Sequence, residues 1–303
     1  MRVGLMIEGS TIDEVTEFVA DARRRGFGSV WLTDGIGFEP LTVLGIVGRA
    51  VPDVELGTAV VRTSPRHPMA LAQQALTVNA AVGGRLVLGV GPSHRQPVEE
   101  QWGLSYDRVV RNVREYLSIL VPLVAQGSVD YEGDVYTAHG AFHIDAGRGL
   151  PVLLGALGEQ MLRVAGARAD GTVTTMTGPA TLRSFTCPLL RAAADRAGRP
   201  APRVVAMLPV VVTDDVDAAR ARVAAGLERM AAAPSYARAI RQEGGFPVVA
   251  GSADQVRDEL ASLAAAGVTD LVATRAARPG SDDDRRTASL LDAVARDDSG
   301  SAV

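Results

Sequence analysis

The sequence predicts an α/β fold, a closed (β/α)8 barrel of the TIM type that carries insertion segments. Short runs of β-branched and aliphatic residues recur along the chain, separated by longer stretches rich in Ala, Arg, Glu and Leu with helical spacing. Most of the short runs are apolar throughout, as expected for parallel strands that are covered on both faces. Because eight such units follow one another, they favour a closed barrel over an open doubly wound sheet.

The size of the chain supports a single folding unit. A chain of 303 residues with 47% hydrophobic content can bury one large core, and barrels of this length often form one domain. No low-complexity linker divides the sequence. We therefore expect residues 1–303 to form one domain.

Eight segments are expected to supply the barrel strands. Each is a short run rich in β-branched and aliphatic residues, which suit a buried, pleated strand. In chain order these segments are residues 3–7, 29–33, 54–61, 85–90, 152–154, 172–174, 204–212 and 270–273.

The intervening stretches show helical periodicity. The segment that opens at Ser105, a suitable N-cap, has an apolar stripe and an opposite charged face. The stripe consists of Val109, Val113, Tyr116, Leu117 and Leu120, and the charged face of Arg108, Arg111 and Glu115. Further helices are expected over residues 160–169 and 254–265, and Gly267 provides a left-handed stop after the second of them.

Two stretches interrupt this pattern. In the stretch 127–149, residues 129–136 alternate in polarity and contain turn residues, which predicts a hairpin inserted after the fourth unit. Residues 226–245 are expected to form a second, irregular excursion.

Composition excludes several classes of function. The net charge of −4, the aromatic content of 4% and the absence of a basic block argue against a nucleic-acid partner. Glu8 ends the apolar run at the N-terminus, and no later run approaches the length of a membrane span. We therefore expect a soluble, cytoplasmic protein with no membrane partner.

The residue types that are missing or rare also restrict the chemistry. The chain contains no lysine, which excludes Schiff-base mechanisms and a lysine-dependent phosphate loop. Cys187 is the only cysteine, and we expect it to be a small core residue. His139 and His143 have metal-compatible spacing only on a helix and lie in the predicted hairpin, so no metal site is predicted.

The loop after the fourth predicted strand is the first candidate site. Together with the end of that strand at Gly89, it brings Gly91, Ser93 and His94 to one strand end, so backbone amides and an imidazole gather there. His94 is either a loop histidine bonded to solvent or a general acid/base. A dinucleotide fingerprint is disfavoured, because His94 stands where its third glycine would be and Pro92 intervenes.

Two other strand ends carry candidate groups. Asp34 follows the second predicted strand and is either a turn-forming carboxylate or a functional group at the same barrel face as His94. The run Gly155-Ala156-Leu157-Gly158-Glu159 follows the fifth predicted strand and precedes a helix. Its amides either hold a phosphate or form an ordinary turn, and the sequence leaves both possibilities open.

Several motifs together resemble the bacterial-luciferase-like superfamily, and more narrowly its branch that uses the deazaflavin coenzyme F420. The motifs are WLTD at residues 31–34, LGTAVV at 56–61, RHP at 66–68, GGRLVLGVG at 83–91, GPSH at 91–94, WGL at 102–104 and YDR at 106–108. The resemblance covers nearly the whole chain, and residues 83–116 are its most specific part. It implies a (β/α)8 barrel, and because members of this family commonly dimerise, it also implies a homodimer.

The resemblance also implies roles for individual residues. Asp34 would hydrogen-bond the deazaflavin ring, the Ala59-Val60 bond would be a non-prolyl cis peptide under the ring, and Gly158 and Glu159 would offer amides to the coenzyme phosphate. We expect the remaining cofactor contacts from Gly91, Ser93, Gly155, Ala156 and Leu157. The chain has Gly35 where the sugar-phosphate dehydrogenases of this branch have a histidine, and their glutamate acid aligns with His94, which makes a sugar-phosphate substrate doubtful.

The resulting hypothesis is an F420-dependent oxidoreductase with His94 and Asp34 in the catalytic site. Hydride would pass between C5 of the deazaflavin and an electron-poor C=C or C=N bond, or an alcohol/carbonyl pair, while His94 supplies or accepts the proton. The substrate would be a small molecule or a modified peptide. The alternatives are an FMN-dependent luciferase-like monooxygenase and a non-catalytic flavin-binding barrel.

Overall fold

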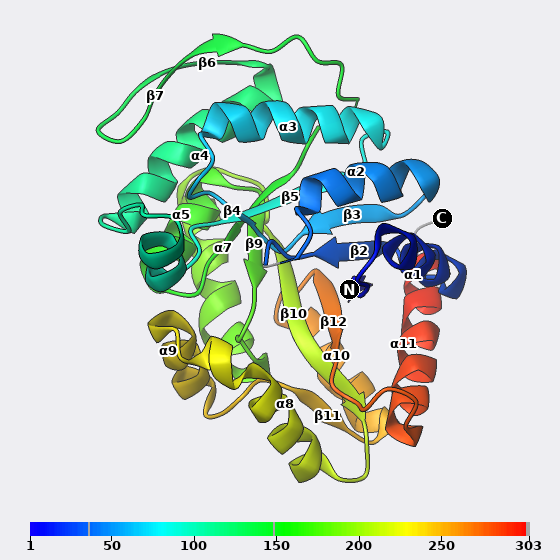
Figure 1. The fold of residues 1–303 in the computed structure, drawn as a ribbon. Coiled ribbons are helices and arrows are strands. Elements are labelled where there is room, and N and C mark those ends of the chain that lie inside the picture. Colours follow the sequence, from blue (N-terminus) through cyan, green and yellow to red (C-terminus); the bar gives the residue numbers. More distant parts are fainter. Residues whose placement is uncertain (36, 148, 301–303) are drawn as a thin grey trace.

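The predicted barrel is confirmed in a computed structural model that describes residues 1–35, 37–147 and 149–300. Eight parallel strands form the closed ring in chain order, with helices on the outside (Figure 1). They are β1 (Arg2–Met6), β2 (Ser29–Leu32), β3 (Glu55–Thr58), β5 (Leu86–Gly91), β8 (Val152–Gly155), β9 (Gly171–Thr174), β10 (Arg203–Val212) and β12 (Asp270–Arg275). Pairing of β12 with β1, in which Arg2 lies opposite Asp270, closes the ring.

The strands agree with the sequence prediction except at two places. The predicted strand 54–61 is interrupted after Thr58, and its end forms a separate short strand, β4 (Val61–Arg62), that pairs with β5. The unpredicted strand β11 (Val249–Gly251) extends the sheet beside the end of β10.

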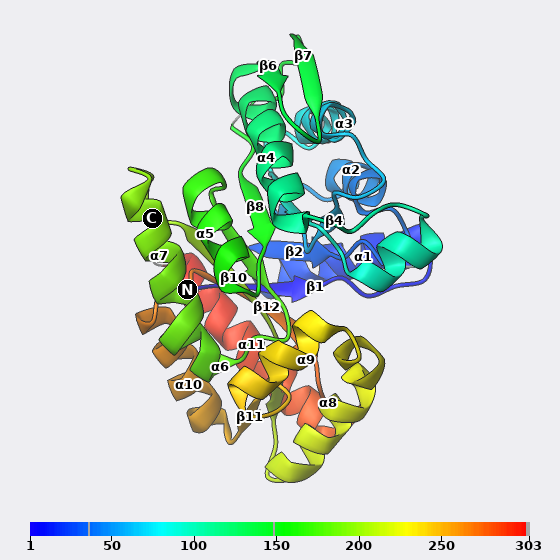
Figure 2. The same ribbon diagram turned by 90° about the vertical axis from the view of Figure 1, so that its left-hand side faces the viewer.

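Helices surround the barrel, as the two views in Figures 1 and 2 show. They are α1 (Ile12–Arg25), α2 (Pro40–Ala50), α3 (Pro68–Ala81), α4 (Val109–Gln126), α5 (Glu159–Arg168), α6 (Pro179–Thr181), α7 (Cys187–Arg196), α8 (Val216–Ala231), α9 (Pro234–Glu243), α10 (Ala253–Ala265) and α11 (Asp282–Gly300), with the π-helical turns η1 (Pro97–Gln101) and η2 (Leu182–Thr186). Among the described residues, no helix combines the length and apolar character that crossing a bilayer requires.

The inserted hairpin is confirmed, and it corrects the predicted faces of α4. Strands β6 (Ser128–Glu132) and β7 (Thr137–Ala141) pair antiparallel and lie at the top of Figure 1. Glu115, expected on the solvent face, is buried because the hairpin turn folds over it and donates backbone N–H groups to its carboxylate. The predicted N-cap is also wrong, because α4 begins at Val109 and the Ser105 hydroxyl instead accepts from the amide of Asp107.

The second excursion is helical, which contradicts the irregular structure predicted for residues 226–245. The end of α8 and the whole of α9 occupy this stretch. Pro234 stands at the first position of α9, and Gly244, with a φ of 85°, ends it. This proline and glycine pattern is a known helix signal, and it was present in the sequence.

A charged cluster closes the barrel at the amino ends of its strands. The Arg203 guanidinium, at the start of β10, donates to both oxygens of Asp270 at 2.9 and 2.7 Å and also pairs with Glu55. It lies 5.6 Å from the ring centroid of Trp31, which fills the barrel interior. Burial disfavours the charged guanidinium, but its hydrogen bonds to both carboxylates more than offset this and raise the pKa of Arg203.

Candidate active site at the carboxyl ends of the strands

The loop that carries Asp34 and the end of β5 at Gly91 meet at β4. The backbone amide of Arg62 donates to Asp34 Oδ2 at 3.1 Å, and the amide of Thr63 donates to the Gly91 carbonyl at 2.9 Å. Because β4 continues the third barrel strand, these contacts lie at the carboxyl ends of the barrel strands. His94 follows Gly91 by three residues, so the structure brings Asp34 and the His94 loop to the same end of the barrel.

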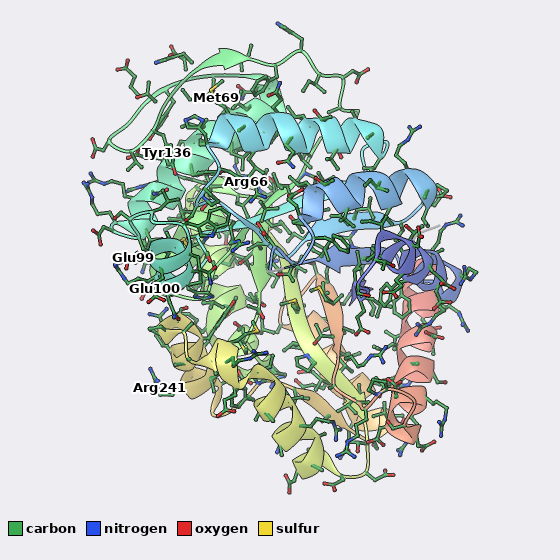
Figure 3. All side chains as sticks on the ribbon, in the orientation of Figure 1. Arg66, Met69, Glu99, Glu100, Tyr136 and Arg241 are labelled. Atoms are coloured by element: carbon green, nitrogen blue, oxygen red, sulfur yellow. The ribbon has the colours of Figure 1, made fainter. Side chains whose placement is uncertain are left out.

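Asp34 is held by two arginines that the sequence analysis did not predict as site residues. Arg62 Nη2 lies 2.9 Å from Asp34 Oδ1, and Arg66 Nη1, whose side chain is labelled in Figure 3, lies 3.0 Å from Oδ2. The Asp34 side chain is only 6% exposed. Burial raises its pKa, but the hydrogen bonds and charge of Arg62, together with the charge of Arg66, outweigh that effect and lower the pKa overall. The carboxylate therefore remains ionised.

Arg62 connects this ion pair to the surface. Its guanidinium carbon lies 5.4 Å from the centroid of the Trp102 ring, which is 45% exposed. A guanidinium at this distance from an indole is attracted to the face of the ring. The aromatic side chain thus lies at the outer edge of the Asp34 cluster.

The Ala59–Val60 peptide is cis, as the resemblance implied. The Val60 side chain lies against the glycines of two neighbouring strands. A Cβ atom at Gly91 would stand 2.6 Å from Val60 Cγ2, and one at Gly89 would stand 2.1 Å from the Thr58 carbonyl oxygen. A Cβ at Gly155 would meet both Val60 methyl carbons at 3.5 Å. These glycines give Val60 and the neighbouring backbone room to lie at the strand ends.

Replacing Gly91 by alanine is expected to destabilise the fold by about 1–3 kcal/mol, because the new methyl group overlaps Val60. Urea denaturation of Gly91→Ala, Val60→Ala and the double variant would measure this overlap. When position 60 is alanine, Gly91→Ala should lower the free energy of unfolding much less than it does when position 60 is valine. Equal losses from Gly91→Ala with valine or alanine at position 60 would contradict the contact.

His94 is bonded to a helix from a distant part of the chain. Its Nδ1 lies 3.0 Å from the hydroxyl of Ser235, and its ring packs edge-on against Tyr236 with centroids 4.4 Å apart. Both partners lie on α9, and Ser235 follows His94 by 141 residues in the sequence. Burial lowers the pKa of His94, which favours the neutral imidazole. The sequence left open whether His94 is a loop histidine bonded to solvent or a general acid/base. The contacts with Ser235 and Tyr236 show that it is not bonded to solvent alone.

The backbone beside His94 is also ordered by specific contacts. Ser93 adopts a φ of 63°, in the left-handed region, and its carbonyl accepts a hydrogen bond from the Tyr106 hydroxyl at 2.9 Å. The His94 carbonyl accepts from the amide of Val98 in η1. The loop thus presents the imidazole from a defined backbone conformation.

The run Gly155-Ala156-Leu157-Gly158-Glu159 connects β8 to α5, which begins one residue earlier than predicted. Ala156 is buried, whereas Leu157 is partly exposed. A Cβ at Gly158 would stand 2.7 Å from Nη2 of Arg238, another residue of α9. The Arg238 guanidinium therefore lies beside the free amides at the start of α5. No carboxylate in residues 1–35, 37–147 or 149–300 forms an ion pair with it.

The residues that the sequence analysis missed thus come mainly from β4 and α9. Arg62 and Arg66 surround Asp34, while Ser235, Tyr236 and Arg238 contact the predicted groups at the other strand ends. The helical signal of residues 234–244 could have identified α9, but no local pattern indicates which strand ends it faces.

Comparison with known proteins relates the chain to one family. The sequence model of the luciferase-like monooxygenases matches residues 1–270. An F420-dependent glucose-6-phosphate dehydrogenase of Nakamurella multipartita is 30% identical over 223 residues, 69% of this chain and 66% of the relative. A 5,10-methylenetetrahydromethanopterin reductase of Methanolobus tindarius is 28% identical over 218 residues, 70% of this chain and 65% of the relative. The matches therefore span just under two thirds of these relatives' lengths.

Solved structures share the fold over nearly the whole chain. A coenzyme F420-dependent tetrahydromethanopterin reductase from Methanopyrus kandleri superposes with a TM-score of 0.74 at 21% identity, covering 96% of both chains. An F420-dependent secondary alcohol dehydrogenase in complex with an F420–acetone adduct gives 0.77 at 19% identity, covering 97% of this chain and 98% of the other. An EDTA monooxygenase from Chelativorans gives 0.79 at 16% identity, covering 100% and 94%. At these identities the likeness establishes the fold.

Proposed function

This chain belongs to the luciferase-like monooxygenase family, and from that premise we propose that it is an oxidoreductase that depends on coenzyme F420. The similar glucose-6-phosphate dehydrogenase and the structurally similar secondary alcohol dehydrogenase are both F420-dependent by name. The observation that carries the proposal is the shared location of Asp34, the Ala59–Val60 peptide and the His94 loop at one end of the barrel.

The residues at the carboxyl ends of the barrel strands fit the phosphate and the ring of coenzyme F420. The start of α5 offers amides at Glu159 and Gln160, and Arg238 adds a positive charge beside Gly158, whose missing side chain leaves room for the guanidinium. Val60 presents an apolar surface beside Gly91 and Gly155 that suits a flat ring. Of the remaining predicted contacts, Ser93 lies in the loop after β5, and Ala156 and Leu157 lie in the loop between β8 and α5.

The chemistry is divided between the coenzyme and the protein. A bound deazaflavin provides two-electron hydride chemistry at C5. Asp34, kept ionised by Arg62 and Arg66, is proposed to accept a hydrogen bond from the ring, and His94 to hold the proton that accompanies the hydride. The proposed substrate is a small molecule or a modified peptide with a C=C, C=N or alcohol/carbonyl group. We further propose that the enzyme acts as a cytoplasmic homodimer.

Equilibrium titration of the purified protein with F420 and with FMN tests the cofactor assignment. We expect F420 to bind with a Kd on the order of micromolar, and FMN at least about a hundredfold more weakly. Strong FMN binding without F420 binding would overturn the proposal and favour the FMN-dependent monooxygenase. Binding of F420 without turnover in a broad substrate screen would favour the non-catalytic barrel.

Arg238→Ala is expected to weaken F420 binding about tenfold, because a charge-assisted hydrogen bond to the phosphate would be lost. Arg241→Ala is the matched control, since Arg241 lies on the same helix and is exposed (Figure 3). The control should bind as the wild type does. Equal weakening by both substitutions would indicate a general charge effect instead of a phosphate contact.

A further inference from the structure

The contact between His94 and Ser235 has a chemical consequence, because an imidazole has two distinct nitrogens. The hydrogen bond made by one nitrogen influences which of them carries the proton in the neutral ring. A serine hydroxyl can accept from a protonated Nδ1 or donate to an unprotonated one. Nδ1 is bonded to the Ser235 hydroxyl at 3.0 Å. Within the part of the chain that the structure describes, no hydrogen bond joins Nε2 to another residue. Nε2 is therefore the nitrogen left to face a substrate.

Ser235 is held in place by the anchoring of α9 at both of its ends. Near the beginning of the helix, Tyr236 packs edge-on against the His94 ring. At the end, the Glu243 carboxylate accepts hydrogen bonds from the amides of Ala180 at 3.1 Å and Thr181 at 2.8 Å, at the start of α6. Ala239, between them, is buried. Because the helix is fixed on both sides, the serine hydroxyl reaches His94 from a defined position.

The neighbours of His94 leave its ring without a bonded countercharge. The hydroxyl of Ser235 is neutral, and burial raises the pKa of Tyr236 to about 12, so its phenol stays protonated near neutral pH. No carboxylate among the described residues is hydrogen-bonded to the imidazole. A neutral partner can orient the ring without fixing a positive charge on it, which suits a group that must both take up and release a proton.

Because a base at Nε2 requires the ring proton to be on Nδ1, we propose that Ser235 is the positioning residue of the proton-transfer site: its Oγ, 3.0 Å from Nδ1, accepts the Nδ1–H of His94 and leaves the Nε2 lone pair to exchange the proton. The catalytic part of this inference rests on the proposed function. In the oxidising direction, Nε2 takes the proton from the substrate atom next to the carbon that gives up the hydride, and the two hydride electrons leave with that hydride for the coenzyme. In the reducing direction, the protonated Nε2 returns the proton to the same atom.

The tautomer of His94 can be measured without coenzyme or substrate. Long-range proton–nitrogen NMR spectra distinguish the two neutral forms, and the chain has four histidines, so His94→Gln assigns the signal by its loss. Above the pKa of the imidazole, we expect the wild type to show the Nδ1–H form. Ser235→Ala should shift the balance toward Nε2–H, and Ser235→Thr, which keeps the hydroxyl, should retain the wild-type form. Ser184→Ala, at an exposed serine that bonds Ala180, is the control and should change nothing.

Kinetics with F420 and a substrate found by screening provide the second measurement. Ser235→Ala should lower kcat about tenfold with little change in KM, since one hydrogen bond to the catalytic group is lost, and Ser235→Thr should restore most of the rate. An Nε2–H form in the wild type, or a tautomer that Ser235→Ala leaves unchanged, would overturn the inference. Failure of F420 to bind while the tautomer responds as expected would overturn the proposed function alone.

Discussion

Substituting alanine for His94 is expected to lower kcat by about 10²- to 10⁴-fold, the range typical for removal of a general acid or base. The physical reason is that the proton that accompanies hydride transfer would then have to pass to or from water. The imidazole is half-buried against α9, and within residues 1–35, 37–147 and 149–300 no titratable side chain is hydrogen-bonded to its ring. Steady-state kinetics with F420 and the screened substrate measure the effect.

Coenzyme titration separates loss of chemistry from loss of binding. His94→Ala should bind F420 nearly as the wild type does, because His94 is not itself one of the proposed coenzyme contacts and α9, which carries Arg238, remains anchored through Glu243. Unchanged turnover in this variant would remove His94 from the mechanism. A loss of coenzyme affinity equal to the loss of rate would assign it to binding instead.

The second large effect is expected at the opposite end of the barrel. Arg203→Ala should lower the free energy of unfolding by about 2–4 kcal/mol, because Asp270 and Glu55 lose the guanidinium that they share and Asp270 keeps only the more exposed Arg2, at 2.9 Å, as an arginine partner among the described residues. Asp270 is 1% exposed and receives two hydrogen bonds from Arg203. Urea denaturation, with midpoint and slope both compared, measures the loss.

Arg199→Ala is the matched control for this prediction. Arg199 pairs with Asp170 at 2.9 Å, but the two side chains are 28% and 47% exposed. An exposed pair of this kind contributes about 0–1 kcal/mol, so the control should be nearly neutral. Similar effects of the two substitutions would show that burial does not govern the strength of the Arg203 cluster.

The barrel could be predicted from the sequence because its strands carry their own signal. Runs such as 86–90 and 204–212 are apolar throughout, which is the pattern expected of a strand covered on both sides. The sequence did not predict that the third strand is interrupted. Residues 54–61 are rich in β-branched side chains from one end to the other, and this pattern indicates a single strand. Periodicity reports residue type and not the pairing partner.

Glu115 illustrates a different limit. A helical wheel places a residue relative to its own helix, whereas Glu115 is buried by a hairpin turn that follows it by about twenty residues. The turn amides satisfy the carboxylate, which makes its burial possible. Such burial depends on tertiary contacts that a single-helix pattern does not contain.

The sequence predicted part of the candidate site, namely the groups that lie at strand ends. Asp34 and the His94 loop were assigned to one barrel end because parallel strands end together, and the structure agrees. The partners of His94 and Gly158 lie on α9, far along the chain, where the sequence shows a helix but not its docking position. Long-range contacts of this kind require the folded coordinates.

The spacing of two α9 residues links the two halves of the site. Ser235 and Arg238 are three positions apart, which places them on neighbouring points of one helical face. A rigid displacement of α9 would change the hydroxyl beside His94 and the cation beside α5 together. Proton handling and coenzyme retention would then be mechanically coupled, and a ligand that pushed this helix outward would loosen both in a single motion.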